Sequence, residues 1–259
     1  MKLLNLNVCM KLDNTEGVVH LIKRENPELC TLQEVMHAME ESCFPMYKSK
    51  NELVRLDEYP FVVFAPLYVA KAVTKNGEVT RDFGGKAEQG SLLLSKYKLL
   101  SHKNEFYYNE YRYEYDATEF REKDWCRSIQ NVILNVDGRK LQIINVHGIW
   151  NKDKLGDERT IAQSEFILSR IREDIPVLVV GDFNLLPNTE SIKMLNEKMT
   201  NLIEKFGVTS TRPKFDDGLD KGEFVCDYIF VNDKVKVNDF KVLEDEVSDH
   251  LPFILDFDI

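Results

Sequence analysis

The chain has 259 residues, of which 43% are hydrophobic and 30% are charged, as in ordinary globular proteins. It carries 44 Asp or Glu residues and 34 Lys or Arg residues, so its formal net charge is −10. This charge excludes a passive basic scaffold for nucleic acid, but not an enzyme that uses a metal cation to bind phosphate. No apolar run approaches the ~18 residues of a membrane-spanning helix, and the amino terminus turns polar too early for a secretory signal.

The cysteines indicate the redox environment. They are odd in number, widely spaced and contain no Cys-x-x-Cys pair, and they are Cys9, Cys30, Cys43, Cys126 and Cys226. This pattern predicts buried free thiols rather than a disulfide framework or a zinc site. We therefore expect a cytoplasmic protein.

The first two thirds of the chain predict one helix among many strands. A strand from Lys2, a helix capped near Asn14 and a strand over 28–33 make a β-α-β unit. Asn76-Gly77 and Asp137-Gly138 predict two-residue hairpin turns, because these residues tolerate positive φ. Further strands are predicted at 61–65, 68–74, 91–95, 132–134 and 141–144.

The last third alternates helices and strands again. A helix is predicted over 157–173, a strand with both faces covered over 176–180, and a second helix capped at 188–190. Strands follow at 226–231, 235–242 and 252–257. Helices near each end with hairpins between them predict an α/β fold of mixed sheets covered by helices. Without a linker or a break in composition, we expect a single domain over residues 1–259.

Polar residues stand where apolar strands are predicted to end, and they are the candidates for a functional site. They are Asn7, Glu34, His147, the segment 181–184 and the segment 248–250, with Asp227 at the start of a further strand. Ligands of open α/β sheets bind beyond the ends of strands. We therefore expect these side chains to converge on one cleft.

Asp182 and Asn184 are two residues apart, so on an extended chain their side chains point the same way. A carboxylate and an amide on one side can orient a water molecule and hold a phosphate oxygen. The alternative is a turn in which both side chains satisfy loose backbone groups. Their place after an apolar strand, together with the other candidates, favours the functional interpretation.

Glu34 is a candidate ligand for a hard cation. Mg²⁺ takes few carboxylates and keeps several waters, so Glu34 with Asp249 or Asn7 would suffice. Taken alone, a Glu before a helix-like segment is more often a favourable charge at the helix dipole.

His250 stands just before the last predicted strand, where a histidine titrates near neutral pH and needs a carboxylate to fix its tautomer. Asp227 is the candidate partner. The adjacent Asp249 would point elsewhere, which suits contact with a metal or water. The alternative is a surface turn that ends at Pro252.

Other polar residues have two interpretations each. His147 can donate to a phosphate oxygen or a leaving group, or it is a satisfied histidine at a strand end. Arg127 can bind phosphate in a bidentate fork or pair with a surface acid. Arg159 and Gln163 are four apart on a predicted helix, and we expect them to brace the loop that carries Trp150.

Six motifs occur in an order and at distances that resemble those of a known family. They are Asn7, Leu32-Gln33-Glu34, Asn145-Val146-His147, Gly181-Asp182-Phe183-Asn184, Cys226-Asp227-Tyr228-Ile229 and Ser248-Asp249-His250-Leu251-Pro252. Over its whole length the chain resembles the endonuclease/exonuclease/phosphatase superfamily, whose fold is that of deoxyribonuclease I. The resemblance implies a four-layer α/β/β/α sandwich, with two mixed sheets face to face and helices outside. It also implies metal-dependent hydrolysis of phosphoesters.

The resemblance further implies roles for the candidates. Glu34 would be the principal Mg²⁺ ligand, helped by Asn7 and Asp249, with Mn²⁺ as a substitute. Asp182 and Asn184 would position or activate the attacking water.

It also implies roles for the histidines. Asp227 would orient His250, which stabilises charge on the phosphoryl oxygens. His147 matches a second family histidine, and Glu88 resembles the acidic residue that supports this histidine in deoxyribonuclease-like members.

The family includes nucleases, deadenylases, sphingomyelinases and inositol-phosphate phosphatases. The segment 185–187 lacks the basic character of inositol phosphatases, and His147 argues against apurinic endonucleases. The acidic balance disfavours long duplex DNA, and without an apolar membrane-inserting hairpin a lipid substrate gains no support. We therefore expect a phosphodiesterase or nuclease, and no obligate protein partner is evident from the sequence. The alternatives are a phosphatase of a small metabolite or lipid head group, and an inactive phosphate-binding module.

Overall fold

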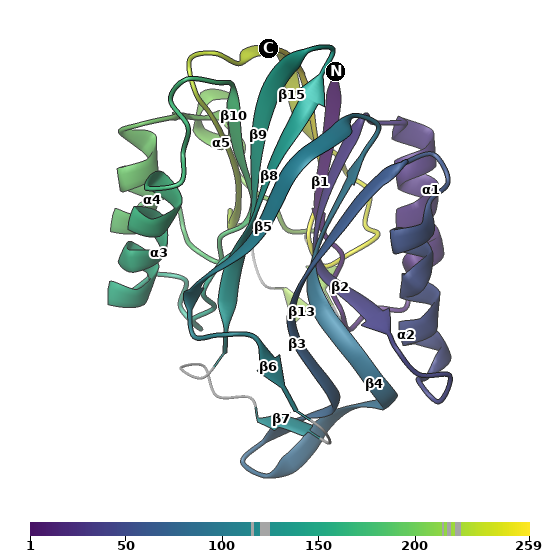
Figure 1. Ribbon diagram of the computed structural model, residues 1–259. Coiled ribbons are helices and arrows are strands. Elements are labelled where there is room, and N and C mark those ends of the chain that lie inside the picture. The colour runs from purple at the N-terminus through teal and green to yellow at the C-terminus, as the bar shows by residue number, and fades with distance from the viewer. Residues whose placement is uncertain (115–116, 120–124, 214, 217–218, 221–223) are drawn as a thin grey trace.

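Two β-sheets lie face to face, and helices cover their outer sides (Figure 1). The computed structural model describes residues 1–114, 117–119, 125–213, 215–216, 219–220 and 224–259. Helices α1 and α2 cover one sheet, and α3 and α4 cover the other, so the order of layers is helix, sheet, sheet, helix (Figure 1). The predicted four-layer α/β/β/α sandwich is confirmed.

The first sheet has the strand order β15-β16-β1-β2-β4-β3-β6, and β7 also pairs with β3. Its strands are β1 (Lys2–Asn7), β2 (Leu29–Ala38), β3 (Phe61–Lys75), β4 (Glu78–Ser95), β6 (Arg112–Tyr113), β7 (Ala117–Glu119), β15 (Lys236–Val242) and β16 (Phe253–Asp258). Strands β1 and β2 are parallel, because α1 connects them, whereas β3 and β4 form a long hairpin.

The second sheet has the order β11-β14-β10-β9-β8-β5. Its strands are β5 (Lys98–Tyr108), β8 (Arg127–Val136), β9 (Arg139–His147), β10 (Val177–Asp182), β11 (Thr200–Asn201) and β14 (Asp227–Val231). Strands β9 and β10 are parallel and β14 is antiparallel to β10. A separate short pair joins β12 (Phe215–Asp216) to β13 (Leu219–Asp220).

The helices on the first sheet are α1 (Thr15–Glu25), α2 (Pro45–Ser49) and the 3₁₀ helix η1 (Lys50–Arg55). Those near the second sheet are α3 (Glu158–Leu168), α4 (Glu190–Asn196) and α5 (Leu202–Lys205). In α1, the buried Leu21 and Ile22 follow the buried Val18 by three and four residues, as a helix with one apolar face requires. Within the described residues, no helix has the length and apolar character needed to cross a bilayer.

The alternation of side chains along β1 separates two apolar cores. Leu3 packs between the sheets with residues of the second sheet, whereas Leu4 and Leu6 pack under α1. Each such buried leucine contributes about 2 kcal/mol to folding. Because successive residues alternate, Asn5 and Asn7 share the inner face with Leu3, and β1 therefore aims Asn7 at the opposite sheet.

Most of the predicted elements are present, with longer strands than expected. The two turns are formed by Asn76-Gly77 and Asp137-Gly138, all with positive φ. The strands predicted at 61–65 and 68–74 are one strand, β3, which bends at a register shift. The five cysteines are free and buried, as predicted.

Candidate active site

Three acidic or imidazole side chains lie in one row across the second sheet. Asp182 on β10 is paired in register with His147 on β9 and with Asp227 on β14. Residues directly opposite one another in neighbouring strands point to the same face. The register therefore places all three side chains on the inner face, where each is at least 95% buried.

A β-bulge brings Glu34 to the same place from the first sheet. The pairing of β2 with β4 shifts between Leu32 and Val35, and Glu34 has a left-handed φ of 56°. In regular alternation Glu34 would share the outer face with Leu32. The bulge instead turns its carboxylate toward Asn7 and His147.

Asn7 joins the two sheets. Its Nδ2 donates to Asp182 Oδ2 across the sandwich (3.0 Å) and lies 3.4 Å from Glu34 Oε1. The same Glu34 oxygen is 3.7 Å from Nε2 of His147. These contacts bring together four residues that the sequence places far apart, where β1, β9 and β10 end and β2 forms its bulge.

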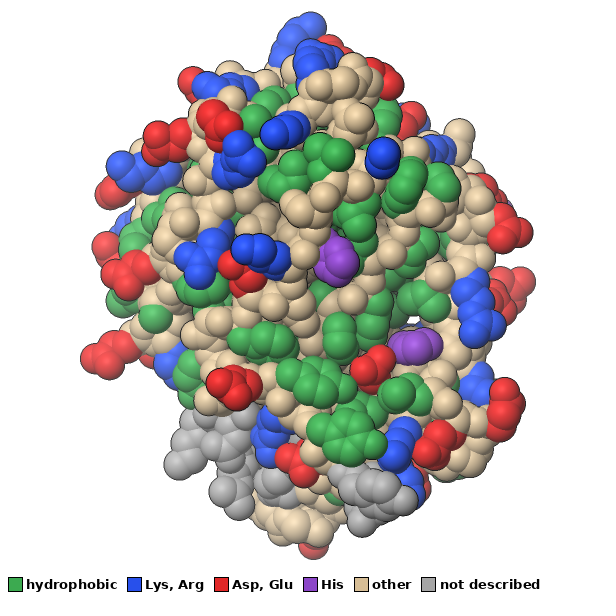
Figure 2. Space-filling model, in the orientation of Figure 1, with side chains coloured by type: hydrophobic (Ala, Val, Ile, Leu, Met, Phe, Trp, Pro, Cys, Tyr) green, Lys and Arg blue, Asp and Glu red, His purple; other side chains and the backbone are tan. Residues whose placement is uncertain are grey.

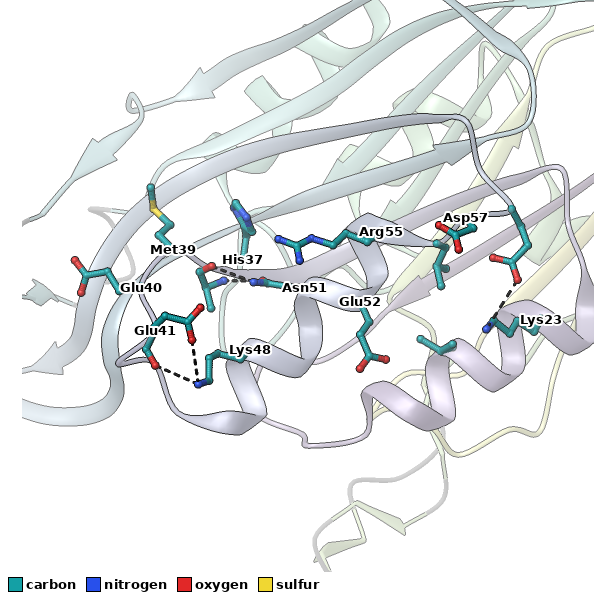
Figure 3. A pocket seen from close by; sticks show the side chains of 14 residues that line it. Lys23, His37, Met39, Glu40, Glu41, Lys48, Asn51, Glu52, Arg55 and Asp57 are labelled. Atoms are coloured by element: carbon teal, nitrogen blue, oxygen red, sulfur yellow. Dashed lines mark hydrogen bonds and ion pairs between the residues drawn. The ribbon is translucent and has the colours of Figure 1, made fainter.

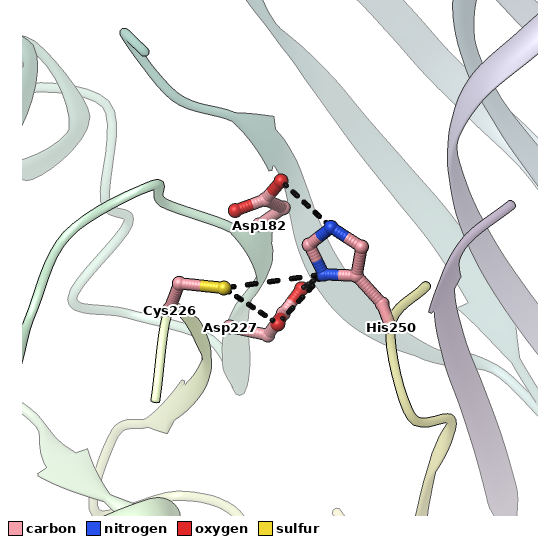
Figure 4. A group of neighbouring side chains, drawn as sticks. All are labelled: Asp182, Cys226, Asp227 and His250. Atoms are coloured by element: carbon pink, nitrogen blue, oxygen red, sulfur yellow. Dashed lines mark hydrogen bonds and ion pairs between the residues drawn. The ribbon is translucent and has the colours of Figure 1, made fainter. Parts of the chain in front are cut away.

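His250 and Asp227 form a buried pair (Figure 4). Nδ1 of His250 lies 2.9 Å from both carboxylate oxygens of Asp227, and Nε2 lies 3.7 Å from Asp182 Oδ2. Burial by itself opposes the charged imidazole, but the two carboxylates outweigh it and raise the pKa of His250 well above its usual value. His250 is therefore a cation at neutral pH, with Nε2 directed at Asp182.

Cys226 completes a group of four buried side chains with Asp182, Asp227 and His250 (Figure 4). Their spacing would suit a metal ion, but the groups already satisfy one another, since Sγ of Cys226 lies 3.2 Å from Asp227 Oδ2. Burial raises the pKa of this thiol to about 12. A thiol is a soft ligand and a poor partner for a hard cation, so this group of four suits the orientation of His250 better than the binding of Mg²⁺.

The residues that suit Mg²⁺ are Glu34 and Asp249. Oε1 of Glu34 has no hydrogen bond shorter than 3.4 Å among the described residues, and Oδ1 of Asp249 lies 3.9 Å from His250 Nε2. Both are hard oxygen donors, as Mg²⁺ prefers. Asn7 fits less well, because its Oδ1 accepts the backbone N–H of Cys9 and its Nδ2 faces carboxylates.

The second histidine has the opposite charge state. Burial, together with the nearby cation of Arg127, lowers the pKa of His147 to about 3. His147 is therefore neutral at pH 7, and its Nδ1 has no hydrogen-bond partner among the described residues. Two histidines on one site are thus set to different protonation states by their surroundings.

Close backbone packing shapes the turn that carries Asp182 and Asn184. A β-carbon on Gly181 (φ 141°) would lie 2.0 Å from the carbonyl oxygen of Val146, so only glycine fits. Asn184 has a left-handed φ of 58°, and its backbone N–H donates to Asp182 Oδ1 (2.8 Å). Asp182 and Asn184 therefore face the site together, as predicted, but through a turn after β10 and not through the alternation of an extended chain.

Two predicted residues are engaged elsewhere. Arg127 does not present a phosphate fork, because its Nε donates to Gly148 O (2.8 Å) and its Nη1 to Cys126 O (3.0 Å). The predicted support of His147 by Glu88 is wrong. The carboxylate of Glu88 contacts Nδ1 of His37 (3.3 Å) and accepts the hydroxyl of Tyr111 (3.1 Å).

Three cations near the site were not expected from the sequence. Arg212 donates to Asp249 Oδ2 (2.8 Å), and Asp249 keeps a pKa below its usual range because His250 and Arg212 outweigh burial. Lys154 donates to Oδ1 of Asn184. Lys50 is 2% exposed and holds the loop after β1 through two carbonyl oxygens. All three come from loops or a short helix, and their spacing in the sequence carries no signal.

A cavity of about 750 Å³ lies outside this site, between η1 and the ends of α1 and β2 (Figure 3). Its charged side chains partly pair with one another, as in Lys48 with Glu41 and Lys23 with Glu58. The side chain of Asn51 hydrogen-bonds the backbone of Ala38: its Oδ1 accepts the N–H and its Nδ2 donates to the carbonyl oxygen.

The surface charge is mixed. On the face shown in Figure 2, blue cationic and red acidic side chains are interspersed over the molecule. This face offers no continuous basic patch for a long polyanion.

Comparison with known proteins identifies the family. A profile of the Endonuclease/Exonuclease/phosphatase family matches residues 4–250. No curated protein sequence matches the chain significantly.

Solved structures of similar fold cover the full chain. A family protein from Leptotrichia buccalis superposes with a TM-score of 0.70 at 18% identity, with 100% of both chains covered. D. rerio TDP2 complexed with a single-strand DNA product gives 0.69 at 15% identity, covering 100% of this chain and 99% of that one. A mannosyl-6-phosphatase from Bacteroides thetaiotaomicron gives 0.68 at 14% identity, with 100% of both covered. At these identities the similarity shows the shared fold.

Proposed function

Because the chain belongs to the endonuclease/exonuclease/phosphatase family, and is therefore a phosphoesterase, we propose that it is a Mg²⁺-dependent phosphodiesterase in which water attacks phosphorus in line. The family match confirms the resemblance seen in the six motifs. The observation that carries the proposal is the convergence of Glu34, Asp182 and the His250–Asp227 pair on one edge of the sandwich.

In this proposal the charge of each side chain determines its role in the reaction. Asp182 orients the attacking water and accepts its proton, and the amide of Asn184 holds the water or a phosphoryl oxygen. Protonated His250 donates to a non-bridging oxygen as negative charge grows on it. Neutral His147 is placed to hydrogen-bond the phosphate group.

Glu34 and Asp249 would hold Mg²⁺, with a smaller contribution from Asn7. Bound there, Mg²⁺ supplies Lewis-acid stabilisation of the phosphoryl oxygens, and Mn²⁺ would serve as a substitute. Crowding carboxylates at one point is otherwise unfavourable, because like charges resist ionisation together. The acidic site is thus consistent with a bound cation.

Two substrate classes have support from similar structures. TDP2 with its single-strand DNA product favours a diester in nucleic acid, and the mannosyl-6-phosphatase favours a small phosphate monoester. We take the diester as the first candidate and propose a cytoplasmic location. A lipid head group and a catalytically inactive binding module are further outcomes that the experiment distinguishes.

The test is hydrolysis of bis(p-nitrophenyl) phosphate and p-nitrophenyl phosphate with Mg²⁺, followed by a panel of single-stranded DNA, RNA, a nucleotide, inositol phosphates and sphingomyelin. We expect the diester to be hydrolysed faster than the monoester, and we expect EDTA to abolish this activity.

Glu34→Ala and His250→Ala should lower kcat by about 10²–10³-fold without loss of fold. Activity that survives EDTA or either substitution would contradict these roles, and a chain that binds phosphate without turnover would be a binding module.

A further inference from the structure

The side chain of Asn184 sits between a cation and an anion. Its Oδ1 accepts from Nζ of Lys154, and its Nδ2 lies 3.2 Å from Oδ2 of Asp182. An ammonium can only donate, whereas an ionised carboxylate can only accept. The amide of Asn184 can therefore satisfy both neighbours in only one orientation, with Oδ1 toward Lys154 and Nδ2 toward Asp182.

The loop between β9 and α3 holds the ammonium of Lys154 beside Asn184. Lys154 has a left-handed φ of 59°, and its carbonyl accepts the backbone N–H of Leu186 (2.9 Å), just beyond Asn184. At the start of the loop, Ile149 N donates to Gln163 Oε1 on α3 (2.9 Å), as the predicted bracing role of Gln163 requires. The loop is therefore fastened at both ends, and a left-handed lysine there carries a conformational cost of about 1 kcal/mol.

Lys154 is also partly shielded from water. Its Nζ lies 5.1 Å from the ring centroid of Trp150, within the range of a cation–π contact. Burial lowers the pKa of the ammonium, and the carboxylate of Asp182 opposes that effect. The positive charge thus lies beside the reacting groups and not in free solvent.

We infer that Lys154 is a positioning residue of this site, whose ammonium fixes the Asn184 amide so that Nδ2 faces Asp182 and the substrate. This inference adds a residue to the proposed site, and its kinetic test rests on the proposed function. Lys154 acts through Asn184, so it is not itself a catalytic residue. Its loss leaves Oδ1 without its donor and lets the amide rotate, which weakens the donor that the attacking water or phosphoryl oxygen needs.

The kinetic experiment compares Lys154→Met with Lys154→Arg, and with Lys152→Met as the matched control, because Lys152 is an exposed lysine of the same loop. With Mg²⁺ and bis(p-nitrophenyl) phosphate, we expect Lys154→Met to lower kcat by about 10- to 100-fold with little change in KM. Lys154→Arg should recover most of kcat, and Lys152→Met should match the wild type.

A double substitution tests the route of the effect. In an Asn184→Ala background, adding Lys154→Met should lower kcat by less than about 2-fold, because the group it orients is gone. Full activity of Lys154→Met, or losses that multiply in the double variant, would overturn the inference. Thermal unfolding of each variant separates a lost fold from a lost orientation, and Lys154→Arg remains informative if the methionine variant does not fold.

A second readout needs no substrate. The side-chain amide resonances of Asn184, assigned by their loss in Asn184→Ala, should shift and broaden in Lys154→Met but not in Lys152→Met. Unchanged resonances would overturn the inference. If the wild type hydrolyses none of the phosphoesters, the proposed function fails, while this measurement still decides whether Lys154 holds Asn184.

Discussion

At the scale of single residues, Asp227 determines the charge of His250. The pair is buried, and burial favours the neutral imidazole; Asp227 makes the largest contribution against this effect and Asp182 the next largest. With the carboxylate, the pKa of His250 is raised, so the imidazolium persists at neutral pH and is lost as the pH rises through this elevated value.

Asp227→Asn should therefore move the alkaline limb of the pH–rate profile toward neutral pH. The amide keeps the shape and a hydrogen bond but removes the charge that holds the proton. The measurement is kcat/KM from about pH 5 to about pH 10. Asp245→Asn, which removes an acid that pairs with Arg24 on the surface, is the control. A profile that coincides with that of the wild type would show that Asp227 does not control the proton of His250.

The sequence indicated which side chains carry chemistry, but not how some of them meet. Asp182 and Asn184 were predicted from a spacing of two on extended chain, whereas the structure brings them together through a turn in which Asn184 has a left-handed φ. Glu34 reaches the site only through a bulge, and a bulge depends on the pairing of β2 with β4. Lys154 and Arg212 come from loops, whose conformation depends on contacts distant in sequence.

At the scale of elements, the start of α3 was predictable because the signal is local. Asp157 accepts the backbone N–H groups of Arg159 (2.9 Å) and Thr160 (3.3 Å), and Thr160 Oγ1 accepts the N–H of Asp157 (3.0 Å). By contrast, β5, α2 and η1 were not predicted. Strand β5 is largely exposed and polar at its start, and the two short helices, which begin at Pro45, are too short to show a helical period.

Asp157→Ala should lower the free energy of unfolding by about 1 kcal/mol, because it removes the cap. Asp157→Asn should cost less, because asparagine caps equally well and only the charge is lost. A hydrogen bond from Arg159 lowers the pKa of Asp157, so the contribution of the charge is present above the ordinary aspartate pKa and disappears as the pH falls through the lowered value. Urea unfolding at neutral and at acidic pH checks this. A difference between wild type and Asp157→Asn that persists in acid would contradict the assignment.

At the scale of the whole molecule, a buried network of amide side chains joins the sheets, in addition to the contact between Asn7 and Asp182. Gln33 Nε2 on β2 donates to Asn145 Oδ1 on β9 (2.7 Å), and Asn145 Nδ2 donates to Gln130 Oε1 on β8 (3.0 Å). All three amides are buried within the sandwich, beside the apolar core. In their motifs Gln33 comes just before Glu34, and Asn145 comes two residues before His147. Their role is structural, because the hydrogen bonds between them hold the two sheets together beside the site.

The organisation of residues 1–259 as one domain stays a prediction, and this amide network offers a test of it. Asn145→Leu removes the link without a large change in volume and leaves Gln130 Oε1 and one N–H of Gln33 without their partners. Each unsatisfied buried group costs about 1–3 kcal/mol, so for two such groups the free energy of unfolding should fall by roughly 2 to 6 kcal/mol.

The control is Asn238→Leu on β15, where the amide is exposed and a change within about 0.5 kcal/mol is expected. Urea unfolding followed by fluorescence and by circular dichroism should give one coincident transition in both variants, because the two sheets bury each other and neither is complete alone. Two separate transitions in Asn145→Leu would mean that the sheets fold as independent units. A loss no larger than that of the control would mean that apolar packing alone sets their alignment.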